Sequence, residues 1–410
     1  MSPHLEVTAD AAELGLDPSR LDRLKAHFDR YVANEVLPGY LISVAREGEV
    51  AAVLEGGMAN RETGQPITSD NLWRIYSMTK PITTVALMSL YEEGRFDLND
   101  EVARYLPAFG DTRVYVGGPA IAPLTEPQLA PMRIWHLLSH TAGLTYGFDY
   151  LHPTDQIYRD AGFDFGTPRE ITLAEATDRF ASFPLRFQPG TAFNYSVATD
   201  VVGRLIEVLT DQPLDQVLEE RVFAPLGMVD TGFFAKEEDH ERVAELYLNL
   251  GGGLHPGGPM SKGAFRAPWM LSGGGGLVSS AHDYHRFTTM LLAGGVLDGV
   301  RILSSRTLAL MVANHLPEAQ SLAEAAVDGY AEVHNEGVGF GLGFATVIDQ
   351  LASKTLTSEG SFYWGGAAST MFWVDPLEGL TVQFFTQLLP SGDHQFRREL
   401  TQLSYQALID

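Results

Sequence analysis

The chain has 410 residues, of which 45% are hydrophobic and 20% charged, a composition typical of a globular protein with a substantial core. Its formal net charge of -24 disfavours binding to nucleic acid or to an anionic membrane surface. The sequence contains no cysteine, which excludes disulfides, thiolate metal sites and cysteine nucleophiles.

The N-terminal sequence, MSPHLEVTAD, has neither the basic segment nor the apolar run of a secretory signal. Nowhere does the sequence approach the roughly 18 consecutive apolar residues of a membrane span. We therefore expect a cytoplasmic protein. The sequence does not indicate an oligomeric state.

The first part of the chain predicts a surface helix, a β-hairpin and a buried helix. Residues 11–34 carry apolar residues at helical spacing, and the strand-like runs 40–45 and 50–54 flank a short polar turn. Residues 72–93 begin with Trp-Arg-Ile-Tyr and continue as a strongly apolar helix. The Gly- and Pro-rich segment 110–131 predicts a loop or a small hairpin.

Helical patterns dominate the middle of the chain, and strand patterns return near its end. Helices are expected over 198–209, 214–223, 281–292 and 395–408, and strands over 339–348, 356–364, 370–374 and 380–385. This order predicts an α/β fold with an antiparallel sheet built from both chain ends and flanked by helices. We expect residues 1–75 and 275–410 to form that domain and residues 76–274 a mostly helical one. The active site would lie in the cleft between them.

Ser77 and Lys80 form the most suggestive pair in the sequence. Residues three apart share a helix face, so Lys80 can place its amine beside the Ser77 hydroxyl, which needs a neighbouring base to become a nucleophile. The same pattern would arise from a helix-capping serine and a surface lysine. However, this is the only S-x-x-K in a chain with five lysines, and the helix that follows is apolar on several faces.

Two further segments match what this chemistry requires, although each alone is compatible with ordinary packing. Tyr195 follows the turn at Gln188-Pro189-Gly190 and could share a proton with Lys80. The segment Trp364-Gly365-Gly366-Ala367 lies at the end of a predicted strand, where glycines allow close approach and N–H groups can bind an oxyanion.

Five segments occur in an order that is found together in one superfamily. They are Ser77-Met78-Thr79-Lys80, Ile134 to Leu144, Pro189-Gly190 with Tyr195-Ser196, Gly275 to Phe287, and Trp364-Gly365-Gly366. With them the chain resembles the serine β-lactamase and penicillin-binding-protein superfamily, in particular the class C β-lactamase-like branch with the family VIII carboxylesterases. The resemblance implies a β-lactamase/transpeptidase-like fold and an acyl-enzyme on Ser77.

Two departures from the superfamily pattern shift the expected substrate. Val197 stands where the Y-x-N motif has asparagine, and Trp364-Gly365-Gly366 replaces K-T-G, which removes a cationic anchor for a carboxylate. The resemblance to family VIII therefore favours a small-molecule carboxylic ester, with a short acyl chain expected, over a lactam or a peptide. It also implies Lys80 and Tyr195 as the base, and the N–H groups of Ser77 and Ala367 as the oxyanion site.

Other functions stay open at this point. They are weak β-lactamase or D-amino-acid-specific peptidase activity, acyl transfer to an alcohol, and a non-catalytic penicillin-binding-like role. The segment Phe148 to Phe165 could line an acyl pocket or simply pack as a loop.

The sequence predicts neither a metal nor a cofactor. The pairs His136/His140 and His282/His285 lack a clear third metal ligand and are expected to be structural.

Overall fold

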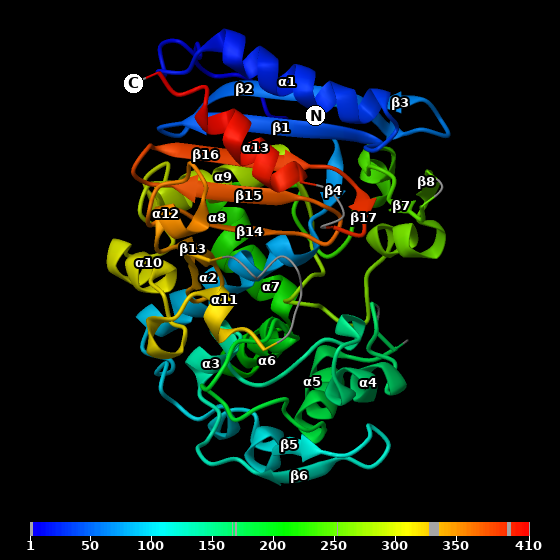
Figure 1. Ribbon diagram of the computed structural model, residues 1–410, viewed down its shortest axis with the longest axis vertical. Helices are drawn as coiled ribbons and strands as arrows, with labels where there is room; N and C mark the ends of the chain where they lie inside the picture. Colours follow the sequence, from blue (N-terminus) through cyan, green and yellow to red (C-terminus); the bar gives the residue numbers. More distant parts are fainter. Residues whose placement is uncertain are drawn as a thin grey trace.

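The computed structural model describes residues 3–165, 167–168, 170–251, 253–327, 336–391 and 395–409. One end of the molecule holds a large sheet with helices on both faces, and the other end is mostly helical (Figure 1). Both chain termini lie at the sheet end. No helix in these ranges is long and apolar enough to cross a bilayer.

The main sheet combines strands from the two ends of the sequence, as predicted. The antiparallel pairing of β1 with β16 joins the two sets, with Leu41 opposite Phe385. In spatial order the strands are β12 (Val338–Phe340), β13 (Ala345–Val347), β14 (Phe362–Gly365), β15 (Met371–Asp375), β16 (Leu380–Phe385), β1 (Gly39–Arg46), β2 (Glu49–Asn60) and β3 (Gln65–Pro66).

The two faces of the sheet bury different side chains because successive residues of a strand point to opposite sides. On β1, Tyr40 and Ile42 pack in the cluster formed with α1 (Pro18–Ala33) and α13 (Phe396–Tyr405). Leu41 belongs instead to the inner core shared with α9 (Ala281–Leu292). The sheet is therefore covered on both faces, which explains why β15 and β16 are buried along their whole length.

The helical end of the molecule is organised around α6 (Ala198–Thr210), which contacts four other helices. The β5–β6 hairpin projects at its far end (Figure 1), and confirms the small hairpin predicted within 110–131. The remaining elements are α2 (Thr79–Glu92), α3 (Ile134–Leu138), α5 (Leu173–Ser182), α7 (Leu214–Leu218), β5 (Arg113–Gly117) and β6 (Leu124–Pro127).

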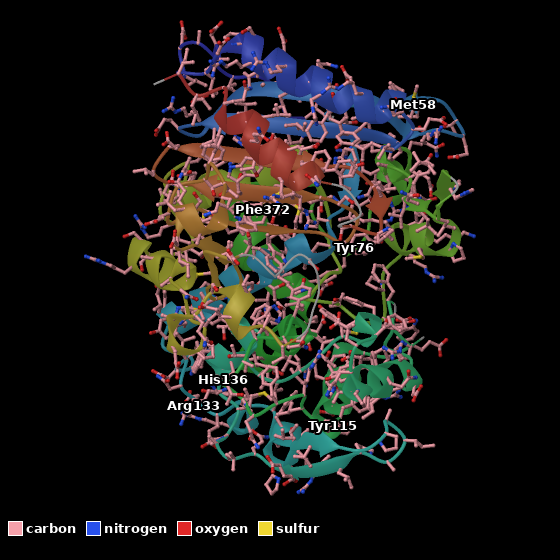
Figure 2. The ribbon with its side chains drawn as sticks, in the orientation of Figure 1. Met58, Tyr76, Tyr115, Arg133, His136 and Phe372 are labelled. Carbon is pink, nitrogen blue, oxygen red and sulfur yellow. The ribbon has the colours of Figure 1, made fainter. Side chains whose placement is uncertain are left out.

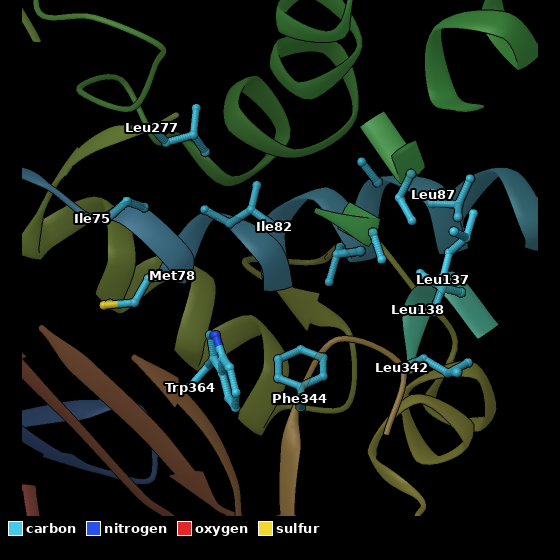
Figure 3. Close-up of a cluster of buried hydrophobic side chains, with 14 of the residues drawn as sticks. Ile75, Met78, Ile82, Leu87, Leu137, Leu138, Leu277, Leu342, Phe344 and Trp364 are labelled. Carbon is cyan, nitrogen blue, oxygen red and sulfur yellow. The ribbon is translucent and has the colours of Figure 1, made fainter. Parts of the chain in front are cut away.

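Helix α2 lies between the sheet end and the helical end. Eleven of its residues are buried, from Thr79 to Leu90, which confirms the expectation of a buried apolar helix. Figure 3 shows Trp364 and Phe344 pointing from the strand side toward this helix, with Leu137 and Leu138 of α3 near its other end. Lys80, in the first turn of α2, is therefore buried together with the apolar residues that follow it.

The fold class is confirmed, whereas the proposed division into two domains stays a prediction. One predicted strand, 339–348, is instead the tight hairpin of β12 and β13. The chain reverses at Gly341 and Gly343: a Cβ on Gly341 would lie 2.1 Å from the Met311 carbonyl oxygen, and Gly343 has φ +91. Only glycine satisfies both positions without strain.

Candidate active site

Ser77 lies on a single 3₁₀ turn (η1, Tyr76–Met78) that connects β4 (Leu72–Arg74) to α2. The residue before it, Tyr76, has a φ of 43, a left-handed conformation that a non-glycine residue adopts only when the surrounding structure holds it. That support includes the Tyr284 hydroxyl of α9, which donates to the Met78 carbonyl at 3.0 Å. Tyr76 lies at the junction between the two ends of the molecule (Figure 2).

The Lys80 amine is 1% exposed and lies beside the Ser77 hydroxyl. Its Nζ donates to Ser77 Oγ at 3.2 Å and to the Gly274 carbonyl at 2.7 Å. A third bond runs to the Tyr146 hydroxyl at 3.0 Å, and the amine lies 4.5 Å from the centre of the Tyr195 ring. Lys80 is therefore directed at the predicted nucleophile rather than at solvent.

Burial lowers the pKa of Lys80 to about 7, and the negative charge of Asp200 acts against that shift. Desolvation disfavours the ammonium form, since the charged group loses its hydration. A substantial fraction of the Lys80 amine is consequently neutral at neutral pH. A neutral amine can accept a proton from Ser77, as a general base must.

Tyr195 and Trp364, which the sequence assigns to separate segments, are in contact. The Trp364 indole N–H donates to the Tyr195 hydroxyl at 3.3 Å, and the two ring centres are 5.2 Å apart. Trp364 itself is only 5% exposed, and its indole supports Tyr195 from within the core. The role predicted for Trp364 in the substrate site thus stays a prediction, with contact to Tyr195 as its observed position.

Tyr146 is a candidate that the sequence analysis missed. Besides accepting from Lys80, its ring stacks on Phe148 at 4.5 Å between centres and lies 5.4 Å from the ring of Tyr195. It follows the Ile134 to Leu144 motif by two residues, but no spacing in the sequence relates it to Lys80. The only signal is a hydroxyl-bearing aromatic residue just after that motif.

The glycines of the Trp364 segment allow β14 to pass close to the chain that leads to Ser77. A Cβ on Gly366 would lie 2.4 Å from the Ile75 carbonyl oxygen, and one on Gly365 would overlap the Arg397 guanidinium. This close approach brings Ala367 to the wall of the cavity that also holds Ser77. Its use as an oxyanion donor stays a prediction.

The cavity in front of Ser77 has a volume of about 780 Å³. Tyr146, Tyr195 and Asp200 line it together with Ser77 and Ala367. The rest of the wall is mostly apolar and includes Phe148, Phe163, Phe165, Phe180, Phe233 and Met260. Five residues of the predicted segment 148–165 thus line the cavity, namely Phe148, Tyr150, Phe163, Asp164 and Phe165. Tyr158 instead packs against Phe180 and Phe183.

Both histidines of the first predicted pair have structural contacts. His136 Nδ1 accepts from the Arg133 N–H at 3.0 Å, and burial lowers the pKa of His136 to about 4. His140 is fully buried against Tyr195, and burial followed by the charge of Lys80 holds its pKa well below the usual range. Within the described part of the chain, no three His, Cys, Asp or Glu side chains gather as a metal site.

Comparison with known proteins relates this geometry to a family. A family model described as Beta-lactamase matches residues 24–406. An uncharacterized protein of Mycobacterium tuberculosis is 35% identical over 87% of this chain and 87% of its own length. Esterase EstB of Burkholderia gladioli is 33% identical over 93% of this chain and 94% of its own. The solved structure of EstCE1, described as a hydrolase with promiscuous acyltransferase activity, matches with a TM-score of 0.78 at 27% identity, covering 96% and 99% of the two chains.

Proposed function

Because the chain belongs to the Beta-lactamase family, we propose that it is a serine hydrolase that cleaves uncharged carboxylic esters through an acyl-enzyme on Ser77. One observation carries the proposal: the buried Lys80 amine, with a pKa near 7, donates to both Ser77 and Tyr146. A buried lysine with a lowered pKa and these hydrogen-bond partners is poorly explained by packing alone. The similarity to an esterase supports the choice of reaction.

The proposed reaction has two steps, acylation of Ser77 and hydrolysis of the acyl-enzyme. Ser77 Oγ attacks the ester carbonyl carbon while its proton passes to the group formed by Lys80 and the tyrosines. The N–H groups of Ser77 and Ala367 would hold the oxyanion, each donor contributing about 3 kcal/mol. Collapse expels the alkoxide, which takes up the proton and leaves as the alcohol. Water then attacks the acyl-enzyme, gives its proton to the same group, and the acid leaves as Ser77 Oγ is reprotonated.

Lys80 and Tyr195 cannot be assigned separate base roles from geometry, since strongly interacting groups titrate as a unit. Lys80 faces the ring of Tyr195 at 4.5 Å, and Trp364 donates to the tyrosine hydroxyl. The Tyr146 hydroxyl accepts from the same amine. We therefore treat the lysine and the two tyrosines as one proton-accepting group.

The charges around the cavity support an uncharged ester over a β-lactam carboxylate or a peptide. Among the described residues that line it, Arg74 is the only basic one. Its guanidinium is already engaged by the carbonyls of Ala244 and Ser261 and by the Gln387 side chain. Hence the one basic side chain among the described residues of this wall is already committed to other partners and is not directed at a substrate carboxylate.

The test is burst kinetics with a p-nitrophenyl ester. The wild type should release a stoichiometric burst of p-nitrophenol, and Ser77→Ala should lose both the burst and the turnover. A matched control is Ser182→Ala, at the exposed end of α5. Turnover that survives in Ser77→Ala would overturn the assignment of the nucleophile.

A second experiment tests which class of substrate the enzyme prefers. Rates over p-nitrophenyl esters of increasing chain length, with nitrocefin included, should favour the esters, and short acyl chains are the expectation. Nitrocefin turnover exceeding that of every ester would favour the β-lactamase alternative. The absence of a Ser77 adduct in intact mass spectra with a fluorophosphonate probe would favour a non-catalytic binding protein.

Acyl transfer to an alcohol is a second candidate, supported by the size of the cavity. A volume of about 780 Å³ has room for an acyl group and an acceptor alcohol together. EstCE1 is itself described as having promiscuous acyltransferase activity. Product analysis with an added alcohol distinguishes the two, because transfer forms a new ester in place of the free acid.

A further inference from the structure

Asp200 is a fully buried carboxyl group that the proposed mechanism has not yet used. It lies in the first turn of α6, and the residue is 4% exposed. Its Oδ1 accepts from the Ser272 hydroxyl at 2.6 Å and from the Gly274 N–H at 3.0 Å. An acidic group is rarely buried so completely unless it is paired.

The same Gly274 connects Asp200 to the catalytic lysine. Its N–H faces Asp200, while its carbonyl accepts from Lys80 Nζ at 2.7 Å. The preceding residue is held as well, since the Thr83 hydroxyl of α2 donates to the Gly273 carbonyl at 2.8 Å. One residue of backbone therefore lies between a buried carboxylate and a buried amine.

The glycines at this point are required by the close packing of α6 against the 272–276 loop. A Cβ on Gly274 would lie 2.9 Å from Asp200 Oδ2, and one on Gly273 would lie 2.9 Å from the Thr199 carbonyl oxygen. Because Gly274 carries no side chain, the Asp200 carboxylate can approach the backbone closely enough to bind it directly. The loop is thus fixed from both sides, by α2 and by α6.

We propose that Asp200 is a positioning residue that acts through Lys80: it orients the Gly274 peptide so that its carbonyl binds the lysine amine, and supplies the negative charge opposite the ammonium. This rests on the proposed function, in which Lys80 takes the Ser77 proton. When that proton arrives, the nascent ammonium faces a carbonyl whose direction Asp200 has fixed. The carboxylate compensates the charge in a site that excludes water.

The titratable and charged groups around Lys80 define what the test must separate. His140 lies on the α3 side, Tyr146 and Tyr195 face the amine through a hydroxyl and a ring, and Asp200 comes from α6. Burial raises the pKa of Asp200, and the Ser272 hydrogen bond, the Lys80 charge and the Gly274 N–H offset only part of that rise. Asp200 is the acidic member of this group, so its charge is the one to remove.

The experiment is a pH titration of Lys80 followed by ¹³C NMR with label at lysine Cε. The chain has five lysines, and a spectrum of Lys80→Ala identifies the signal of Lys80. In Asp200→Asn, the loss of the negative charge disfavours the ammonium, so the Lys80 midpoint should fall by about one pH unit. The acid limb of kcat/KM should move to lower pH by the same amount.

Asp178→Asn is the matched control, because it makes the same substitution at an exposed carboxylate on α5. Its Lys80 midpoint should stay within about 0.3 pH units of the wild type. An unchanged midpoint in Asp200→Asn, or an equal shift in both variants, would overturn the proposal. Should the asparagine prevent folding, Asp200→Ala repeats the comparison, because it removes the charge without adding a donor beside the Gly274 N–H.

The titration uses no substrate, so its outcome does not depend on the reaction proposed above. Turnover retained in Ser77→Ala would overturn the proposed function while leaving the midpoint shift intact. An unshifted midpoint together with a burst lost in Ser77→Ala would overturn the role of Asp200 alone.

Discussion

Two parts of the cavity wall differ in what they bury. The first, here called the polar end, consists of Ser77, Tyr146, Tyr195 and Asp200. It also includes the buried Lys80, which donates to Ser77 and Tyr146. The second, here called the apolar wall, consists of Phe148, Phe163, Phe165, Phe233 and Met260. In the polar end each group is held by named hydrogen bonds, whereas the apolar wall offers shape and an unreactive surface.

The contrast indicates a division of labour. The polar end sets the protonation of Lys80, because burial lowers its pKa to about 7 against the opposing charge of Asp200. In the proposed function, the apolar wall would exclude water and contact the part of the ester that does not react. Changes in the polar end should therefore reduce kcat, and changes in the apolar wall should act mainly on KM.

The largest effect is expected from Lys80→Ala, which removes the group between Ser77 and the tyrosines. We expect kcat/KM for a p-nitrophenyl ester to fall by about 10²–10⁴-fold or more, as for the loss of a general base. Steady-state rates measure this directly. Lys354→Ala, at an exposed position outside the cavity, should retain the wild-type rate. A Lys80→Ala enzyme within tenfold of that control would contradict the role of the polar end.

The two tyrosines provide the next comparison. Tyr195→Phe and Tyr146→Phe should each lower kcat by orders of magnitude, because each keeps the ring beside the Lys80 amine but removes a hydroxyl of the proposed proton-accepting group. The double variant should lose less than the product of the single losses, since groups that share a proton act as a unit. Tyr115→Phe, on the distant β5 strand (Figure 2), is the control. A wild-type kcat in Tyr146→Phe would reduce Tyr146 to a packing residue.

In the apolar wall, Phe233→Ala should raise KM for a bulky ester by about tenfold and leave KM for an acetate ester nearly unchanged. The reason is that a large substrate loses contact area, whereas a small one does not reach that wall. Phe234→Ala removes an exposed ring from the neighbouring position and serves as the control. An equal rise of KM for both esters would indicate a general disturbance of the site.

The smallest effect concerns stability near the stacked Tyr146 and Phe148. Burial, and then the charge of Asp155, raises the pKa of the Asp149 carboxyl to about 7. The folded protein holds this proton where the unfolded chain, with its ordinary value of 3.8, releases it. The free energy of unfolding should therefore fall as the pH rises from about 4 to 7.

Asp149→Asn removes this titration. The free energy of unfolding should therefore fall less between pH 5 and pH 8 in the variant than in the wild type, by roughly 1–3 kcal/mol. Urea denaturation at the two pH values measures the difference. Asp178→Asn, at an exposed position on α5, should leave the pH dependence unchanged. A pH dependence identical in Asp149→Asn and in the wild type would contradict the assignment.

Most of the fold follows from patterns that are local in the sequence. The strand patterns near both termini predict one sheet built from the two chain ends, and the structure joins them through β1 and β16. The hairpin at 339–348 could not be predicted from such patterns, because the reversal depends on the close approach of Gly341 to the Met311 carbonyl, a contact between distant segments. The apolar pattern alone predicts one continuous strand in place of the two.

The candidate site divides in the same way. Ser77 and Lys80 lie three residues apart, so one helical turn is enough to bring them together. Tyr195 and the Trp364 segment were suggested by a turn and a strand end, and the resemblance to a family supported them, because no spacing relates them to Lys80. Tyr146 left only the signal of its place after a motif, and Asp200 left none. They reach Lys80 from 66 residues away and from the opposite side of a glycine backbone, respectively.

The sequence by itself determined which serine and lysine form the candidate pair, since their relation is a property of one helical turn. It also shows Trp364-Gly365-Gly366 where the superfamily has K-T-G, which underlies the proposal of uncharged esters. The tertiary structure decided how acidic that lysine is, because its pKa depends on burial and on a carboxylate contributed by α6. It likewise decided which aromatic rings line the cavity beside Ser77, since the cavity assembles side chains from segments that no local pattern connects.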